Sequence, residues 1–173
     1  MKKNLLVIAL MATSAFATSA IAADGAVNFT GSITDAACTV DTDSLNQTLD
    51  LGKISRTAFK AAGDIAGTKG FKLVLKDCPS TVTGAVVRFD GNQAAGDNGI
   101  LALTAGEKTA QNVGIQITDA QNKVVPLYSD SSVYSLKTNA TNTLNFRASY
   151  IALSNAVTVG DANAVTQFTI VYQ

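Results

Sequence analysis

The sequence predicts an all-β fold in which two sheets pack face to face as a sandwich. Apolar and polar residues alternate with a period of two in several segments, which places the apolar side chains on one face of each strand. Gly, Asn and Asp separate these segments into short pieces, as turns do between antiparallel strands. Because each strand has one apolar face, two sheets that cover each other bury these faces best.

The strands are predicted from this alternation in chain order. The clearest candidates combine strict alternation with β-branched or aromatic residues, and they are residues 71–76, 113–118, 144–150 and 168–172. Shorter strands are predicted at residues 32–40, 47–51, 85–89 and 124–127. Turns are predicted at residues 77–80, 90–91, 97–99 and 119–122, and residues 55–62 are predicted to form one or two helical turns.

The first 22 residues have the pattern of a secretory signal peptide. Lys2 and Lys3 precede a short apolar run, and Ala20 and Ala22 provide the small residues of a cleavage site after Ala22; Ala17 ends a weaker alternative site. The apolar run is shorter than the roughly 20 apolar residues needed to span a bilayer. We therefore expect an exported chain of 151 residues that is not inserted in a membrane once these 22 residues are removed.

Composition argues against several functions. Without Lys2 and Lys3 the exported chain has 11 basic and 13 acidic residues and no basic cluster, which argues against nucleic-acid binding. There is no histidine, so serine and cysteine triads and imidazole metal sites cannot form. Asp41 and Asp43 lack the further ligands and the glycine of a calcium loop. We expect no enzyme activity, no catalytic residue, no cofactor and no metal.

Cys38 and Cys78 are the two cysteines of the chain. In an exported protein the simplest interpretation is one disulfide, which closes a loop of about 40 residues. Two free thiols are the alternative, but an oxidising compartment makes them unfavourable.

The two ends of the exported chain complete the fold prediction. Near the start, Gly25, Val27, Phe29 and Gly31 alternate with other residues, a strand pattern that also fits an ordinary first strand. The other end is Gln173, the residue after a predicted strand, whereas a seven-stranded immunoglobulin-like sandwich usually has one more strand. We therefore expect an incomplete immunoglobulin-like β-sandwich that lacks its last strand and receives one from another chain.

The chain resembles the type 1 fimbrial major subunit family. The residues that carry the resemblance occur in the family's order throughout the exported chain, at 25–33, 35–41, 49–52, 71–78, 112–117 and 146–150. A glycine fourteenth from the end and a tyrosine next to last complete the pattern, here as Gly160 and Tyr172.

The resemblance implies a subunit of a chaperone–usher fimbria that supports bacterial adhesion at the cell surface. Its partners would be a periplasmic chaperone, an outer-membrane usher and identical or related subunits. Residues 23–31 would be the extension that donates a strand, through Gly25, Val27, Phe29 and Gly31, and residues 32–173 would be the pilin domain that accepts one. The chaperone would bind the C-terminal motif, which consists of Gly160, Phe168, Ile170, Tyr172 and Gln173.

One departure from the family pattern concerns the donor extension. After cleavage behind Ala22 only Ala23 and Asp24 precede Gly25, fewer than in many major subunits. Three other functions fit parts of the sequence. A minor adaptor or tip subunit would share this architecture, a sugar-binding adhesin would need a further lectin domain, and a self-contained secreted immunoglobulin-like domain would pair Val27 and Phe29 within its own chain.

Overall fold

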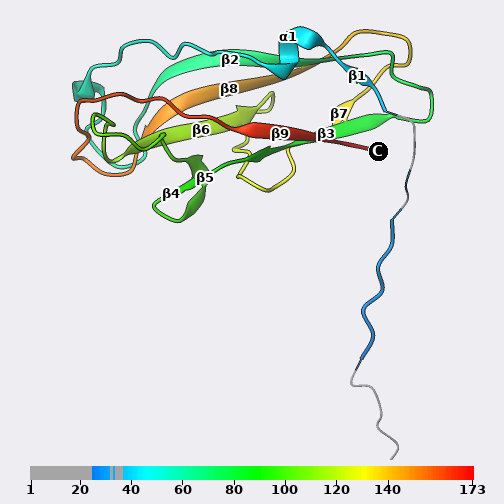
Figure 1. Cartoon of the computed structure of the whole chain (residues 1–173), viewed down its shortest axis with the longest axis horizontal. Helices are drawn as coiled ribbons and strands as arrows, with labels where there is room; N and C mark the ends of the chain where they lie inside the picture. Colours follow the sequence, from blue (N-terminus) through cyan, green and yellow to red (C-terminus); the bar gives the residue numbers. More distant parts are fainter. Residues whose placement is uncertain (1–24, 32, 34–36) are drawn as a thin grey trace, which may run out of the picture. The chain divides into compact units, whose positions relative to one another are not determined.

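The computed structural model in Figure 1 describes residues 25–31, 33 and 37–173. The chain divides into two units, residues 1–33 and residues 34–173. The described part of the second unit contains nine strands, one short α-helix and one 3-10 helix. No helix among the described residues has the length and apolar character needed to cross a membrane.

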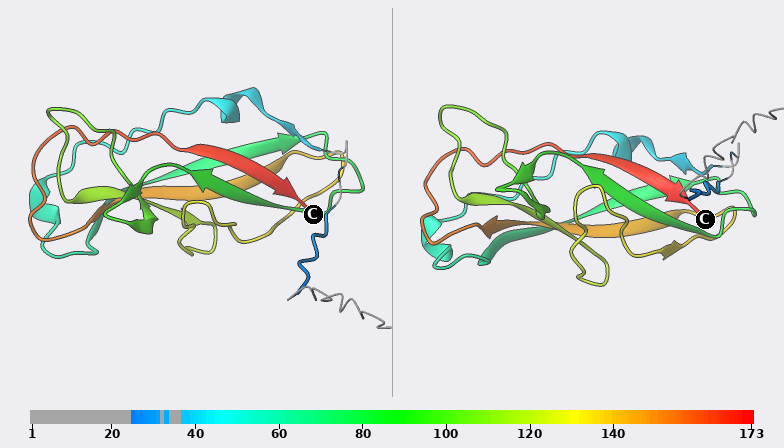
Figure 2. Two further views of the ribbon diagram at one scale, coloured as in Figure 1. Left: turned by 60° about the horizontal axis from the view of Figure 1, so that its bottom comes forward. Right: turned by 90° about the horizontal axis from the view of Figure 1, so that it is seen from below.

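Two antiparallel sheets form the second unit. The larger sheet has the order β1-β2-β8-β6-β5-β4, with β1 at Thr39–Val40, β2 at Ile65–Lys76, β8 at Asn142–Ala152, β6 at Val113–Asp119, β5 at Asp97–Leu101 and β4 at Gln93–Ala94. The smaller sheet has the order β7-β3-β9, with β7 at Tyr134–Ser135, β3 at Gly84–Asp90 and β9 at Gln167–Tyr172. Figure 2 shows β3 and β9 together as a layer across β2 and β8.

The inner faces of the two sheets share one apolar core. The longest pairing joins β2 to β8, where Phe71 lies opposite Phe146 and Leu73 opposite Leu144. Their side chains meet those of β3, and the rings of Phe89 and Phe146 pack edge to face with centroids 5.2 Å apart. A sandwich with antiparallel sheets and a common core is therefore confirmed.

The four strands with the clearest alternation are confirmed as β2, β6, β8 and β9. β6 and β9 are slightly longer than predicted, whereas β2 begins six residues earlier and β8 extends two residues further at each end. The strand predicted at residues 85–89 is confirmed as β3, and the helical turn predicted at residues 55–62 is the 3-10 helix at Arg56–Ala58. These segments follow the pattern because one face of each lies against the core.

Several shorter predictions are wrong or incomplete. Of residues 32–40 only Thr39 and Val40 form a strand, while residues 32 and 34–36 lie outside the described residues. Residues 47–51 form no strand: the α-helix α1, Thr42–Leu45, interrupts the extended chain after β1, and the side-chain amide of Gln47 rather than a backbone group bonds the carbonyl of Lys72. Residues 124–127 contribute one isolated bridge, between Val124 and Thr118.

Two strand pairs were not predicted. The hairpin of β4 and β5 contains small and charged residues with little alternation, and the predicted turn at residues 97–99 is the start of β5. The two-residue strand β7 is too short for a periodic pattern to register. The hairpin covers an edge of β6, and β7 covers an edge of β3. Covering an exposed edge is a need of the folded molecule and leaves no local pattern in the sequence.

Candidate functional site

The C-terminal strand β9 is an edge strand. In the described part of the chain it pairs with β3 and with no strand on its other side. Gln173 and Gly84 exchange two backbone hydrogen bonds, at 2.8 Å and 3.1 Å. Since bonded and non-bonded pairs alternate in an antiparallel ladder, the N–H and C=O groups of Phe168, Ile170 and Tyr172 point away from β3.

The same three side chains point into the sandwich without being fully covered. Phe168, Ile170 and Tyr172 pack against the main core but stay half-buried, whereas Val87 and Phe89 on the neighbouring strand β3 are fully buried. The edge therefore combines six unpaired backbone groups, three N–H and three C=O, with an apolar strip that is partly open. An edge of this kind can pair with an added strand.

The other edge of the small sheet is closed. The backbone N–H of Tyr128 donates to the carbonyl of Phe89, and that of Ser131 donates to the carbonyl of Val87, at 2.8 Å and 2.9 Å. The Ser131 hydroxyl in turn accepts from the N–H of Val87. Residues 128–131 and the short strand β7 thus occupy the backbone groups that β3 would otherwise expose on this side.

Strand β1 provides a second open edge, because no other described strand pairs with its far side. Thr39 and Val40 pair with β2, and the N–H of Asp41 donates to the carbonyl of Val74 at 2.9 Å. The same alternation turns the backbone groups of Cys38 and Val40 away from β2. Val40 is half-buried against the same core cluster as the three inward residues of β9.

The hydroxyl of Tyr172 connects the two edges. It donates a hydrogen bond of 3.2 Å to the backbone carbonyl of Cys38. Burial raises the pKa of Tyr172 and the bond to Cys38 lowers it, and the balance lies above the ordinary tyrosine value. The phenol therefore stays protonated at neutral pH and can donate this bond.

The disulfide between Cys38 and Cys78 is present, as the sequence predicts. It joins the residue before β1 to the second residue after β2, across a sequence separation of 40. Cys78 is fully buried, and the side-chain amide of Asn142 donates to its sulfur at 3.4 Å. The disulfide therefore holds the start of β1 against the larger sheet.

The remaining C-terminal residues have bonds and contacts of their own. The carbonyl oxygen of Gln173 accepts from the N–H groups of Thr83 and Gly84, at 2.8 Å and 3.1 Å. Gly160 lies outside β9, and a Cβ there would meet the carbonyl of Lys108 and approach the nitrogen of Ala110 to 2.5 Å. A glycine is therefore required at this position by close packing within the subunit.

The predicted donor residues form no sheet. Among the described residues Gly25–Gly31 and Ile33, none belongs to a strand. The side chains of Val27 and Phe29 are 77% and 92% exposed. Both large apolar side chains are thus exposed, and neither residue belongs to a strand.

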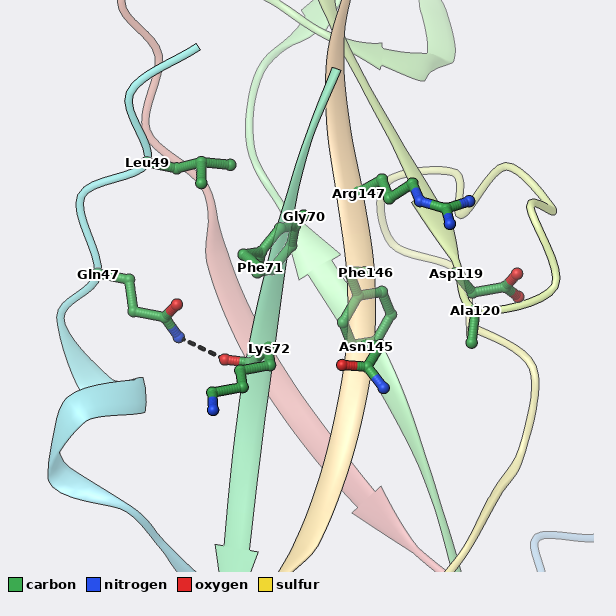
Figure 3. A pocket seen from close by; sticks show the side chains of 10 residues that line it. All are labelled: Gln47, Leu49, Gly70, Phe71, Lys72, Asp119, Ala120, Asn145, Phe146 and Arg147. Atoms are coloured by element: carbon green, nitrogen blue, oxygen red, sulfur yellow. Dashed lines mark hydrogen bonds between the residues drawn. The ribbon is translucent and has the colours of Figure 1, made fainter.

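A shallow hollow of about 680 Å³ lies on the outer face of the larger sheet, and Figure 3 shows its lining. Lys72, Asn145 and Arg147 lie across its floor, and Gln47 lies at one side. The carboxylate of Asp119 accepts hydrogen bonds from backbone N–H groups and is not free for acid–base chemistry. The lining mixes polar and charged side chains with apolar ones such as Leu49 and Phe71 and presents no open backbone edge to an added strand.

Comparison with known proteins decides the family. The sequence model for "Fimbrial protein" matches residues 27–173 of the chain. The chain is also 38% identical over 177 residues to long polar fimbria protein A of Salmonella typhimurium strain LT2, covering 100% of this chain and 98% of that protein. The chain belongs to the fimbrial protein family. It is a structural subunit of a fimbria and acts at the cell surface.

Further relatives agree with this assignment. The fimbrial subunit is 37% identical over 182 residues to the type-1 fimbrial protein A chain of Escherichia coli K12, covering 99% of the subunit and 98% of the relative. A solved type I fimbria protein of Burkholderia pseudomallei is 38% identical and superposes with a TM-score of 0.62, covering 84% of the subunit and 96% of that chain. The P pilus rod subunit PapA has a TM-score of 0.65 at 24% identity, covers 79% and 99%, and supports the fold.

Sequence reasoning missed the partners of the C-terminal segment outside β9. The carbonyl of Cys38 accepts a hydrogen bond from Tyr172, and the N–H of Thr83 donates to the carbonyl of Gln173. Val40 packs against the same core cluster as the inward residues of β9. The only contact that the sequence predicted for Cys38 was its disulfide with Cys78. The alternation of Cys38 and Val40 was a usable signal, because it places both side chains on one face of a short strand.

Proposed function

We propose that the fimbrial subunit polymerises by strand addition, with residues 23–31 of one subunit pairing along β9 of the next. The open edge of β9 carries this proposal, because its outward backbone groups lie beside the half-buried side chains of Phe168 and Ile170. An added strand would pair with the backbone and cover the apolar strip. Val27 and Phe29 are exposed and spaced by two, which suits them to that position.

We also propose that a periplasmic chaperone binds the same edge before assembly and that an outer-membrane usher directs the exchange. Residues 1–22 would be the signal peptide for export to the periplasm; they lie outside the described residues. An apolar edge that is open in the lone subunit is an aggregation hazard, so a carrier that covers it during export has a physical purpose. Gln173 already bonds Thr83 and Gly84, so the chaperone would either break these hydrogen bonds or contact Gln173 while they remain in place.

A charge substitution in the donor segment tests the strand addition. Phe29→Asp removes the burial of one large apolar side chain, worth about 1.5–3 kcal/mol, and should lower fibre yield at least about tenfold. Yield is measured as sheared fibre protein from cells that express the chaperone and usher. Asn28→Asp is the matched control, because it introduces the same charge at the neighbouring position, which faces away from the accepting subunit in a strand.

Recovery of the subunit with its chaperone separates assembly from folding. Both variants should copurify with the chaperone as the unmodified subunit does, since residue 29 would not take part in the accepting edge. Equal fibre yields from Phe29→Asp and Asn28→Asp would show that Phe29 does not dock in a neighbour, and the donor assignment would have to be abandoned.

A further inference from the structure

The position of Tyr172 between two unpaired edges has a consequence for the register of an added strand. Its side chain starts on β9 and its hydroxyl reaches the carbonyl of Cys38, 3.2 Å away, beside β1. The side chain is half-buried, and the neighbouring inward residue Ile170 makes no such bond to β1. At the level of Tyr172, therefore, a hydrogen-bonded side chain spans the space between the edges.

A strand added beside β9 would meet this side chain. Opposite Phe168 and Ile170 the strand can place apolar side chains against the partly open core. Opposite Tyr172 the inward side-chain position is taken by the phenol ring, and the carbonyl of Cys38, a possible acceptor on the β1 edge, is already occupied. Extending the pairing there requires breaking a partly buried hydrogen bond, which is unfavourable unless the acceptor is satisfied again.

Disulfide bonding strengthens the restraint. Cys38 is covalently joined to Cys78, which is fully buried next to Asn142. The acceptor of the Tyr172 hydroxyl therefore cannot move away freely with the start of β1. A fixed acceptor and a fixed strand together keep the phenol in place.

We propose that Tyr172 is a positioning residue that ends the accepting edge, so that an added strand pairs with Phe168 and Ile170 and stops before Tyr172. This inference rests on the proposed strand addition. The hydrogen bond between the Tyr172 hydroxyl and the Cys38 carbonyl sets the register, because it limits how far the strand can slide toward the end of β9. Without that bond the ring can turn aside and one more residue can pair.

Residue-resolved amide hydrogen exchange in assembled fibres tests the stop. In fibres of the unmodified subunit the amides of Phe168 and Ile170 should be protected, and the amide of Tyr172 should exchange at least about tenfold faster, the effect of one missing hydrogen bond. In Tyr172→Phe fibres, which keep the ring but lose the hydroxyl, the amide at position 172 should become as slow as that of Ile170. Tyr134→Phe is the control, since its hydroxyl bonds the carbonyl of Asn145, and it should exchange at these three amides like the unmodified subunit.

The outcomes are distinguishable. Slow exchange at Tyr172 in unmodified fibres overturns the stop and leaves strand addition intact, and this reading does not depend on whether Tyr172→Phe assembles. An amide at position 172 that stays fast in Tyr172→Phe fibres overturns the role of the hydroxyl. Unprotected amides at Phe168 and Ile170 in unmodified fibres would overturn the proposed function and the stop together.

Discussion

Asp119 is a buried carboxylate at the end of β6. None of its surface is exposed, and its oxygens accept hydrogen bonds from the backbone N–H groups of Gln121, Lys123 and Ser132 at 3.0 Å, 2.9 Å and 3.3 Å. These bonds hold the turn after β6 next to the loop that leads to Ser131, which closes the edge of β3. The side chain therefore shapes the closed side of the small sheet.

Asp119→Asn should destabilise the subunit by about 1–3 kcal/mol, because an amide has one acceptor oxygen fewer and leaves a buried N–H unpaired. Urea unfolding of the refolded subunit, followed by circular dichroism, measures this. Asp130→Asn applies the same change to an exposed carboxylate that pairs with Arg88, and should cost less than about 1 kcal/mol. If both variants have the same unfolding midpoint, the hydrogen bonds to Asp119 do not stabilise the fold.

Acid should weaken the same site. Burial raises the pKa of Asp119, but the hydrogen bonds from Ser132, Lys123 and Gln121 outweigh it and lower the pKa below its ordinary value. A carboxyl whose pKa is lower in the folded state stabilises the fold above its unfolded pKa of about 4, and this stability is lost as pH falls through the folded pKa. The stability difference between the unmodified subunit and Asp119→Asn should therefore shrink when unfolding is repeated below about pH 4.

At the scale of elements, the role of a strand depends on whether a neighbour pairs with each of its two edges. β3 lies between β9 on one side and β7 with the loop residues Tyr128 and Ser131 on the other, so most of its residues are buried and its backbone is paired on both sides. β9 alternates strictly and has one open side among the described residues. Both strands were predicted from the sequence, while their different roles follow from their neighbours.

Strand packing also depends on glycine where two strands approach closely. A Cβ at Gly114 in β6 would overlap the Ile100 side chain and lie 2.9 Å from the carbonyl of Leu101. Gly114→Ala should therefore cost about 1–3 kcal/mol through overpacking. Gly70→Ala in β2 is the matched control, because its nearest neighbour would be the carbonyl of Phe146 at an ordinary 3.8 Å.

Urea unfolding checks this pair of variants. Gly70→Ala should keep or slightly raise the unfolding midpoint, since alanine restricts the unfolded chain more than glycine. A Gly114→Ala subunit as stable as Gly70→Ala would mean that β5 can shift away from β6 without loss.

For the molecule as a whole, one covalent link fixes the start of the sandwich. The disulfide from Cys38 to Cys78 closes a loop of 40 residues that contains β1, α1 and β2. Removing it with Cys38→Ser and Cys78→Ser should lower the free energy of unfolding by about 3–4 kcal/mol. Thermal unfolding with and without reductant measures the effect: reductant should destabilise the unmodified subunit and leave the double variant unchanged. A double variant as stable as the oxidised subunit would contradict this.

The sequence alone determined much of the fold. Strict alternation located β2, β6, β8 and β9, because one face of each strand is buried and this leaves a period-two pattern in the residues. The shorter segment predicted at residues 85–89 located β3. It also indicated the disulfide and, through ordered motifs, the fimbrial family. The donor residues Gly25, Val27, Phe29 and Gly31 stay a prediction, and so does the chaperone-binding motif.

Only the tertiary structure decided which edges are closed and which are open. The hydrogen bond from Tyr172 to Cys38 joins residues 134 positions apart, and the loop that closes β3 bonds it over about 40 positions. Residue alternation reports the face that a side chain occupies but carries no information about the strand beside it. Pairing partners are chosen by long-range packing, and for that reason the accepting edge became visible only in the folded chain.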